Sequence, residues 1–569
     1  MRGFGAVLVS LLISPNSTSA QLLPVDSAWV EQTLVGMSID ERVGQLIMPA
    51  HLDMDQSLDL MARLHVGGFW IGKAEAKSIA AALNRLQEAS KFPLLITADF
   101  EKGAGTHIDG ATDLPINMAL GASRSADHVY RASKLTAKEA RALGVHLNFA
   151  PVLDVNNNPK NPIINIRSYS EDPKLVAELS FAAIRGYEEN GLLSTAKHFP
   201  GHGNTSIDTH SKLGTIESDN RGLEAIELKP YTDVLKKTST SAVMTAHLWV
   251  RAVDEDTIPA TLSKNVIDGL LRNRLKYPGI VFTDAMVMGG ITANYSLADA
   301  SVETILAGCD IILWPGNPTT SFEAVKEAVQ KGLLSEARIN DSVRRILRAK
   351  TQAGLHKKRF VDMEKLMTLL GTDDNYQEAK SIAAQCMTLV LDDARLLPLK
   401  PSSKVLVVTI TTQTRNAAMS RTLVTFPADM KKHSPSVDTL VLSELMSAKE
   451  TAQAIDLASK ADVVVCGAFV RIVIGSGTVE LPLAHKSFIQ DLLKANARTV
   501  LIAFGNPYIG GSFPGLSTYV CAYDNARALQ EVAAEALYGK VKFSGRLPVT
   551  ISEKMRFGDG ITAKERKED

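Results

Sequence analysis

Short apolar runs alternate with amphipathic stretches through the first 350 residues, and this alternation restricts the fold more than any other feature. Continuous apolar runs are typical of strands buried on both faces of a parallel sheet, with helices in the connections. Eight such units predict a (β/α)₈ barrel of the TIM type over residues 27–355. The runs are VGQLIMPA (43–50), VGGFWIG (66–72), PLLITAD (93–99), VHLNFAPVLDV (145–155), LLSTAKHF (192–199), AVMTAHL (242–248), GIVFTDA (279–285) and CDIILWP (309–315).

A smaller α/β domain is expected after the barrel. Residues 356–400 contain charged patches and are predicted to form a helical connector. Apolar runs separated by amphipathic helices then resume, which predicts a doubly wound α/β sandwich over 401–556 and a polar, frayed tail at 557–569. No GxGxxG follows the first of these runs, so we expect no dinucleotide site. The expected strands are 404–410, 437–443, 462–469, 498–505 and 518–524.

Charge balance and cysteine spacing exclude several classes of protein. The 569 residues include 62 basic and 62 acidic side chains, which argues against a nucleic-acid partner. No apolar run reaches 18 residues, so we expect no membrane span. The four cysteines have no CxxC spacing, so we expect neither a zinc or redox pair nor a disulfide framework. They are Cys309, Cys386, Cys466 and Cys521.

The N-terminus has the pattern of a secretory signal peptide. Arg2 precedes a short apolar core from Phe4 to Ile13, and small residues ending at Ala20 form a cleavage signal. A buried N-terminal segment is the alternative interpretation. We expect residues 1–20 to be removed and the mature protein to be secreted or periplasmic.

Titratable residues directly follow five of the eight apolar runs, at the ends that form the active-site face of a barrel. A charged residue next to a buried strand is costly unless it is paired or lines a wet site, so we interpret the set as functional. For any single member, an ordinary polar loop residue remains an equal alternative. The residues are Asp99 with Glu101, Asp154, Lys197 with His198, His247, and Asp284.

The loop after the fifth run, KHFPGHGNTSIDTHSKLG (197–214), holds three of the chain's 12 histidines. Asp208 and His210 lie two positions apart, so in an extended segment they share one side. A carboxylate beside an imidazole fixes its tautomer and favours its protonated form, which describes a general acid. Backbone capping, a metal site and a phosphate-binding loop are the alternatives. The chain lacks HExxH and a strand-one HxH, and no GKS/T follows the glycines.

This loop resembles the signature of glycoside hydrolase family 3, in its β-N-acetylglucosaminidase branch. Other segments resemble the family in the same order, and together they cover nearly all of the mature chain. They are NPIINIRSYSEDP (161–173), VMTAHL (243–248) with PATLS (259–263), VFTDAM (281–286) and SGRLPVTIS (544–552).

The resemblance implies a role for individual residues. Asp284 is expected to be the nucleophile, and His210 the general acid/base oriented by Asp208. Near the third strand, DFEKGAGTH places His107 where the family often has an arginine, so fewer donors face the ring hydroxyls there. The residues implied to bind substrate are Asp99, His107, Arg167, Lys197 and His198.

The implied activity is that of a retaining exo-β-N-acetylglucosaminidase acting on peptidoglycan fragments or chitin oligosaccharides, without a metal or organic cofactor. A β-glucosidase or β-xylosidase of the same fold, a non-catalytic sugar-binding cell-wall protein and a metal-dependent amidohydrolase are the alternatives. The Asp-x-His loop disfavours the first, the presence of Asp284 and His210 disfavours the second, and the missing HxH disfavours the third. The sequence leaves open the leaving group, phosphate as an acceptor, the role of the second domain and the oligomeric state.

Overall fold

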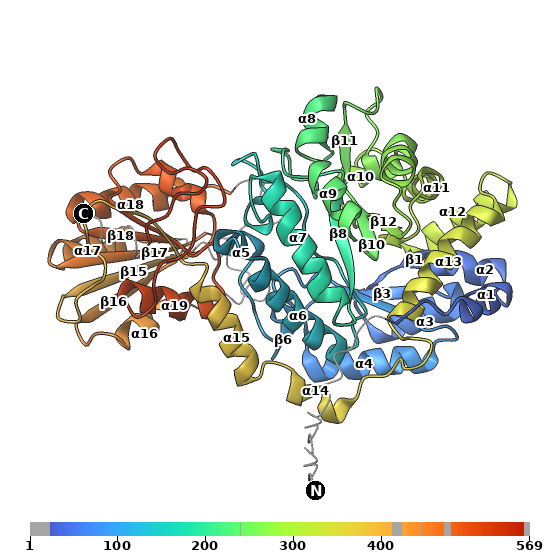
Figure 1. The fold of residues 1–569 in the computed structure, drawn as a ribbon, viewed down its shortest axis with the longest axis horizontal. Helices are drawn as coiled ribbons and strands as arrows, with labels where there is room; N and C mark the ends of the chain where they lie inside the picture. The colour runs from blue at the N-terminus through green and yellow to red at the C-terminus, as the bar shows by residue number, and fades with distance from the viewer. Residues whose placement is uncertain (1–22, 239, 412–423, 444, 471–478, 563–569) are drawn as a thin grey trace, which may run out of the picture.

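The computed structural model describes residues 23–238, 240–411, 424–443, 445–470 and 479–562. Two bodies lie side by side in Figure 1, a barrel on the right and a sheet domain on the left, with α14 (Met363–Leu369) and α15 (Asp373–Ala384) between them in the chain. The predicted signal peptide, residues 1–20, lies outside the described residues. Within the described ranges, every helix is too short or too polar to cross a bilayer.

Seven parallel strands form most of the barrel wall, in the spatial order β12-β10-β8-β7-β5-β3-β2. Pro49 divides the first strand into β1 (Ile47–Met48), which pairs with β13 (Ile312–Leu313), and β2 (Ala50–His51), which pairs with β3. A bridge between Phe282 and Ile311 joins β12 to the β13 segment and closes the wall. Each of the eight apolar runs therefore supplies a barrel strand, and the predicted fold is confirmed. The other strands are β3 (Gly68–Ile71), β5 (Leu95–Ala98), β7 (Leu147–Asn148), β8 (Leu193–Phe199), β10 (Ala242–Thr245) and β12 (Ile280–Phe282).

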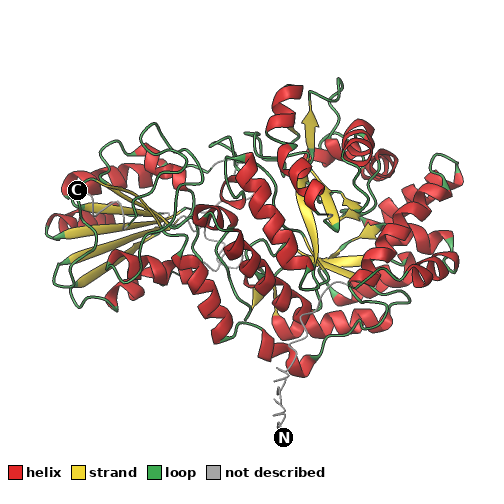
Figure 2. Ribbon diagram, viewed as in Figure 1, coloured by secondary structure: helices red, strands yellow, loops and turns green. Residues whose placement is uncertain are grey.

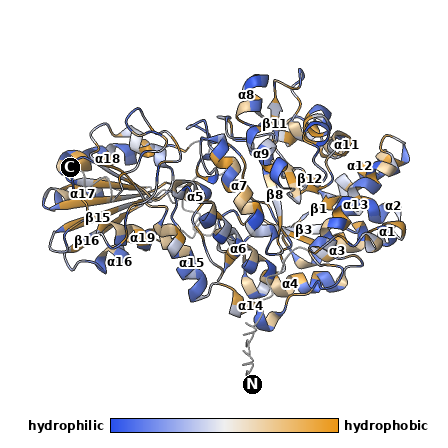
Figure 3. Cartoon of the chain, viewed as in Figure 1, coloured by the Kyte–Doolittle hydropathy of each residue, from blue (hydrophilic) through white to orange (hydrophobic). Residues whose placement is uncertain are grey.

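Helices surround the barrel (Figures 2 and 3), and the major outer helices each contain buried residues. For α7 (Pro173–Glu188), Asp172 caps the first turn by accepting the N–H groups of Lys174 and Leu175, and Pro173 occupies the first position, where no N–H is needed. The major outer helices are α3 (Met54–Leu64), α4 (Ala76–Ala89), α6 (Ala126–Leu143), α7, α9 (Lys229–Lys237), the π-helix Asn265–Arg274, α11 (Leu297–Ala307), α12 (Pro318–Gln330) and α13 (Glu336–Gln352).

Two short strands outside the barrel wall hold the histidine-rich loop. β9 (Gly214–Ile216) follows that loop, and it pairs in parallel with β11 (Leu248–Val250), which follows the next barrel strand. A second small pair, β4 (Ala74–Glu75) with β6 (Ile108–Asp109), flanks the loop after β5. Both strand pairs hold in place loops that follow barrel strands and carry predicted site residues.

The second domain contains a six-stranded sheet in the order β14-β19-β18-β17-β15-β16, in which only the β14–β19 pair is antiparallel. All five predicted strands form. The sixth, β14, lies inside the segment predicted to be a helical connector, 356–400, because one short apolar run after two helices gives no repeating signal. The strands are β14 (Thr388–Asp392), β15 (Val405–Thr411), β16 (Val437–Leu442), β17 (Val463–Phe469), β18 (Thr499–Ala503) and β19 (Thr518–Cys521), covered by α16 (Phe426–Lys431), α17 (Ala448–Ser459), α18 (Leu483–Ala495) and α19 (Arg527–Leu537).

The predicted polar tail is attached to the body through residue 562, the last one described there. Ile561 donates its N–H to the carbonyl oxygen of Leu389 at an N···O distance of 2.7 Å, which extends the hydrogen bonding of β14. The guanidinium of Arg124, from the barrel, lies 4.3 Å from the centroid of the Phe557 ring. The expectation of fraying is therefore wrong for the first part of the tail, because its backbone and one ring have partners. All four cysteines are buried and free.

Candidate active site

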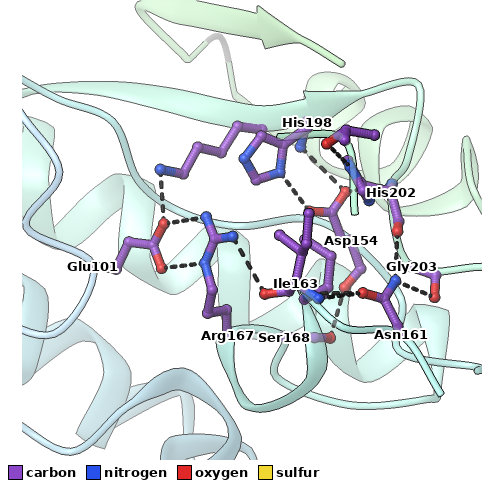
Figure 4. A network of polar contacts seen from close by, with 12 residues as sticks. Glu101, Asp154, Asn161, Ile163, Arg167, Ser168, His198, His202 and Gly203 are labelled. Carbon is purple, nitrogen blue, oxygen red and sulfur yellow. Dashed lines mark hydrogen bonds and ion pairs between the residues drawn. The ribbon is translucent and has the colours of Figure 1, made fainter. Parts of the chain in front are cut away.

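A buried ionic network joins the ends of three barrel strands. Lys197, at the end of β8, has its Nζ 2.7 Å from Asp99 Oδ1 and 2.7 Å from Glu101 Oε1. Arg167 binds the same Glu101 in a bidentate manner, with Nε and Nη2 at 2.9 and 2.7 Å (Figure 4). Burial alone raises the pKa of Glu101, but Arg167 and Lys197 outweigh it and hold that pKa well below its usual range. Three predicted substrate-binding residues are thus assembled around Glu101.

Two tryptophans extend this network at the barrel rim. The second oxygen of Asp99 accepts a hydrogen bond of 2.7 Å from Trp70 Nε1, at the end of β3. The Trp70 ring stacks on Trp314, which follows β13, with centroids 4.8 Å apart and planes inclined by 21°. An aromatic face beside a carboxylate offers a sugar both an apolar platform and an acceptor. The sequence analysis missed both tryptophans, although Trp70 lies near the end of β3 and Trp314 directly follows β13.

Asp154 organises the start of the histidine-rich loop. It is fully buried, and its Oδ2 lies 2.7 Å from His198 Nδ1. Its Oδ1 accepts the backbone N–H groups of His198 and His202 at 3.2 and 2.7 Å (Figure 4). Burial raises the pKa of Asp154, yet the two histidines and these donors leave it below the ordinary value. A charged Asp154 takes Nδ1–H of His198 as its donor, which leaves Nε2 of that ring for another partner.

Asp284 lies just beyond β12 and is half-buried. Its Oδ1 accepts the N–H of Ala285 at 2.7 Å. Burial acts to raise the pKa of Asp284, but the charges of His198 and His247, the Ala285 N–H and the charge of His210 together lower it. The carboxylate is therefore ionised and surrounded by imidazoles, as a nucleophile requires.

His210 and Asp208 form the predicted pair. Asp208 Oδ1 lies 3.0 Å from His210 Nδ1 and also accepts the His210 backbone N–H at 2.9 Å. The Asp208 side chain is 4% exposed, whereas that of His210 is 32% exposed. A buried carboxylate that takes Nδ1–H leaves Nε2 of His210 as the ring's accessible proton carrier.

The loop that carries this pair is bonded to the segment that follows Asp284. Gly289 and Gly290, which begin α10 (Gly289–Thr292), donate their N–H groups to the carbonyls of His210 and Thr209 at 2.9 and 3.0 Å. The Thr209 hydroxyl lies 2.9 Å from His202 Nε2. The histidine-rich loop, which we call the acid loop below, and the segment after Asp284 are thus held together by direct backbone hydrogen bonds.

His247 and His107 occupy different surroundings. His247 is fully buried, with Nδ1 2.8 Å from the Thr261 hydroxyl and Nε2 3.1 Å from the carbonyl oxygen of Ala285. Burial lowers its pKa. A carbonyl oxygen only accepts, so His247 donates from Nε2 to the residue after Asp284 and acts as a support. Burial also lowers the pKa of His107, against the nearby charges of Asp99 and Glu101, and its Nδ1 has no hydrogen-bond partner within the protein.

The predicted site residues therefore fall into one ionic network and one acid loop beside Asp284. Across the described ranges, no three or more His, Cys, Asp or Glu side chains are placed to hold a metal ion. The carboxylates that meet at the barrel mouth already have lysine, arginine or histidine partners.

Comparison with known proteins decides the family. Residues 38–349 match the glycosyl hydrolase family 3 N-terminal domain, and residues 387–566 match the C-terminal domain of the same family. The chain belongs to glycosyl hydrolase family 3. It is a glycosidase of two-domain architecture, and the resemblance drawn from its sequence is confirmed.

Three relatives illustrate the range within the family. A β-N-acetylglucosaminidase/β-glucosidase of Cellulomonas fimi is 29% identical over 550 residues, which cover 92% of this chain and 95% of that protein. The structure of a family 3 β-N-acetylglucosaminidase from Paenibacillus sp. str. FPU-7 matches with a TM-score of 0.83 and 31% identity, over 91% of this chain and 99% of that one. The structure of a β-glucoside phosphorylase matches with a TM-score of 0.84 and 28% identity, over 92% and 96% of the two chains.

Proposed function

We propose that this protein is a retaining exo-β-N-acetylglucosaminidase. The observation that carries the proposal is the Asp208–His210 pair, whose loop is bonded through its backbone to the segment that follows the ionised Asp284. His210 can protonate a leaving oxygen while Asp284 attacks the anomeric carbon, and both residues follow barrel strands at the same end of the barrel.

In the first step, His210 Nε2–H protonates the glycosidic oxygen as Asp284 attacks the anomeric carbon. The bond between that carbon and the leaving oxygen breaks, and a covalent glycosyl-aspartate forms. The Asp208 carboxylate lies 3.0 Å from His210 Nδ1 and stabilises the imidazolium before transfer, as a buried carboxylate does for an adjacent histidine.

In the second step, the neutral His210 takes a proton from a water molecule, which attacks the same anomeric carbon and releases Asp284. Two displacements at one carbon retain the configuration of the sugar. The histidine returns to its protonated form, so the cycle closes without a metal or organic cofactor.

The ionic network around Glu101 recognises the terminal sugar. Asp99 and Lys197 present an acceptor and a donor to ring hydroxyls, and Arg167 is held in place by its bidentate bond to Glu101. His198 Nε2 adds one further polar atom, and the partly exposed His107 lies beside this network. Charged hydrogen bonds of this kind are worth about 1.5–3 kcal/mol each when the group is desolvated.

The proposed substrates are β-linked N-acetylglucosaminides from peptidoglycan fragments or chitin oligosaccharides, and the proposed location is outside the cytoplasm, by way of residues 1–20. One experiment tests the reaction and the sugar class together. Aryl β-N-acetylglucosaminide and aryl β-glucoside are compared with wild type and Asp284→Asn, and the anomer released first is identified by NMR. Turnover of only the glucoside would overturn the sugar class, and release of the inverted anomer would overturn the mechanism.

Phosphate in place of water is a second candidate acceptor, because one structural relative is named a β-glucoside phosphorylase. A neutral imidazole repels an incoming phosphate less than a carboxylate base would. The same assay with and without inorganic phosphate separates the two reactions, since phosphorolysis yields a sugar 1-phosphate and hydrolysis yields the free sugar.

A further inference from the structure

The second domain contacts the loop after β5 at the barrel mouth through an ion triad. Lys102 Nζ lies 2.9 Å from Asp113 Oδ1, in the same loop, and 3.0 Å from Asp524 Oδ2, which follows β19 of the second domain. The Lys102 and Asp524 side chains are 17% and 8% exposed, so water screens this contact only weakly. The triad therefore ties the two domains together at a site with little solvent.

Lys102 adjoins the centre of the sugar-binding network in the chain. Glu101, the residue before it, binds both Arg167 and Lys197. On the other side, Asn148 at the end of β7 clamps Phe100, accepting its N–H at 2.9 Å and donating to its carbonyl at 3.1 Å. The segment 99–102 is thus held from the barrel through Asn148 and from the second domain through Lys102.

The rest of the strand-three loop depends on the same anchor. Leu114 donates its N–H to the carbonyl of Lys102 at 2.9 Å, which brings Asp113 alongside Lys102. Burial and the charge of Asp524 raise the pKa of Asp113, while Lys102 lowers it, so both carboxylates depend on this one ammonium group. The triad and the Leu114–Lys102 hydrogen bond therefore connect Asp524 to the whole loop.

The backbone that presents Asp524 is strained. Tyr523 is fully buried and has a φ of 64°, in the left-handed region that a bulky residue rarely adopts. Its hydroxyl forms a 2.8 Å hydrogen bond with Thr388 on β14, which holds the residue in this conformation. Such strain costs about 1–3 kcal/mol and persists where the surroundings over-determine it, commonly near functional sites.

We infer that Asp524 is a positioning residue for sugar recognition: through Lys102, the second domain sets the place of the loop that carries Asp99 and Glu101. This inference rests on the proposed function, because it assigns that loop to the terminal sugar. Asp524 itself touches no sugar. The small domain thereby contributes to sugar binding without lining the site at this point.

The first test is kinetic and uses the full-length enzyme. Asp524→Asn removes the charge and keeps the shape, and we expect KM for the aryl N-acetylglucosaminide to rise about tenfold, the cost of roughly one well-placed hydrogen bond to a charged group. The value of kcat should change much less, because Asp284 and His210 lie on other loops. Lys102→Met should give the same rise, and the double variant should be no worse than either single one.

Arg124 provides a matched control, because it contacts the second domain at another place on the domain boundary. Arg124 donates to the carbonyl of Leu547 at 3.1 Å and stacks on Phe557, both from the second domain, and contacts nothing in residues 99–114 among the bonds described. Arg124→Met should lower the melting temperature and leave KM unchanged. An equal rise in KM for Arg124→Met would overturn the inference, because domain docking in general would then be the cause.

The second test is independent of turnover. Amide hydrogen exchange of peptides covering residues 99–114 should be faster in Asp524→Asn than in wild type, and unchanged in Arg124→Met. Unchanged exchange in Asp524→Asn, or a KM within twofold of wild type, would refute the positioning role. Failure of wild type to cleave the N-acetyl substrate would instead count against the proposed function, while the exchange result would still judge the domain link.

Discussion

The backbone N–H of Gly289 donates a 2.9 Å hydrogen bond to the carbonyl of His210. This contact joins the loop of the proposed acid to the segment five residues beyond the proposed nucleophile. Space is limited at this point, since a Cβ on Gly289 would lie 2.3 Å from the carbonyl oxygen of Ser211. The two loops can approach this closely because residue 289 has no side chain.

Gly289→Ala should therefore move the acid loop away from Asp284. A shift of about 1 Å in a reacting group costs on the order of 100-fold in rate, so we expect kcat to fall by about that factor. Gly269→Ala is the matched control, because a Cβ there meets nothing nearer than 3.9 Å. Steady-state kinetics measure kcat for both variants. A wild-type kcat in Gly289→Ala would show that the close contact at Gly289 is dispensable.

Asp208→Asn should impair proton donation more than nucleophilic attack. The amide can still accept the His210 backbone N–H, but it no longer stabilises a charged imidazole. General acid catalysis contributes about 10²–10⁴-fold, so kcat/KM for a poor leaving group such as a second sugar should fall within that range. An activated aryl leaving group needs little protonation and should lose much less. Equal losses for both substrates would contradict the assignment of this pair.

His107→Ala tests the residue that departs from the family pattern. The His107 ring lies close enough to Asp99 and Glu101 for their charges to act on its pKa, and the residue is partly exposed, so it can form part of the surface that faces the sugar. We expect KM to rise about tenfold with little change in kcat, the result of losing binding that is equal in ground and transition states. Calorimetric titration with N-acetylglucosamine gives a second measure. His128→Ala, on the outer helix α6, serves as the control and should bind the sugar as wild type does.

Much of this architecture was accessible from sequence because barrel strands have a strong signal. Each of the eight apolar runs is buried on both faces, and the polar residue that ends it faces the barrel mouth by the geometry of the fold. Asp99, Lys197 and Asp284 could be selected on that ground. β14 could not, because a lone antiparallel edge strand has no repeating partner in the sequence.

Contacts between residues that are far apart in the chain could not be predicted from the sequence. Asp524 and Lys102 are 422 positions apart, and nothing in the local pattern around Asp524 indicates a partner in the barrel. The sequence left Asp154 open between a functional residue and an ordinary polar loop residue, and its bonds to His198 and His202 favour a role in supporting the loop. Trp70 and Trp314 have no titratable group, so a pattern of titratable residues at strand ends does not select them.

A buried lysine far from the acid loop should leave a pH signature on stability. Lys350 lies on α13, is fully buried, and donates from Nζ to Gln45 Oε1 at 2.6 Å. Among the described residues it has no carboxylate within ion-pair distance. Burial lowers the pKa of Lys350 from 10.5 to about 7.

The sign of the effect follows from proton counting. Between about pH 7 and 10.5 the unfolded chain keeps the proton on Lys350 and the folded chain has lost it, so the free energy of unfolding rises with pH. The slope is about 1.4 kcal/mol per pH unit within that window and vanishes below it, where both states are protonated. Lys350→Met removes this contribution.

We therefore expect the melting temperature of wild type to rise relative to that of Lys350→Met as the pH is raised from 7 to 9. Thermal unfolding followed by circular dichroism in matched buffers measures the difference. Lys494→Met is the control, because the Lys494 side chain is 77% exposed and loses little contact with water on folding. Parallel curves for wild type and Lys350→Met would mean that Lys350 stays charged in the folded barrel, with Gln45 and its neighbours solvating the ammonium group.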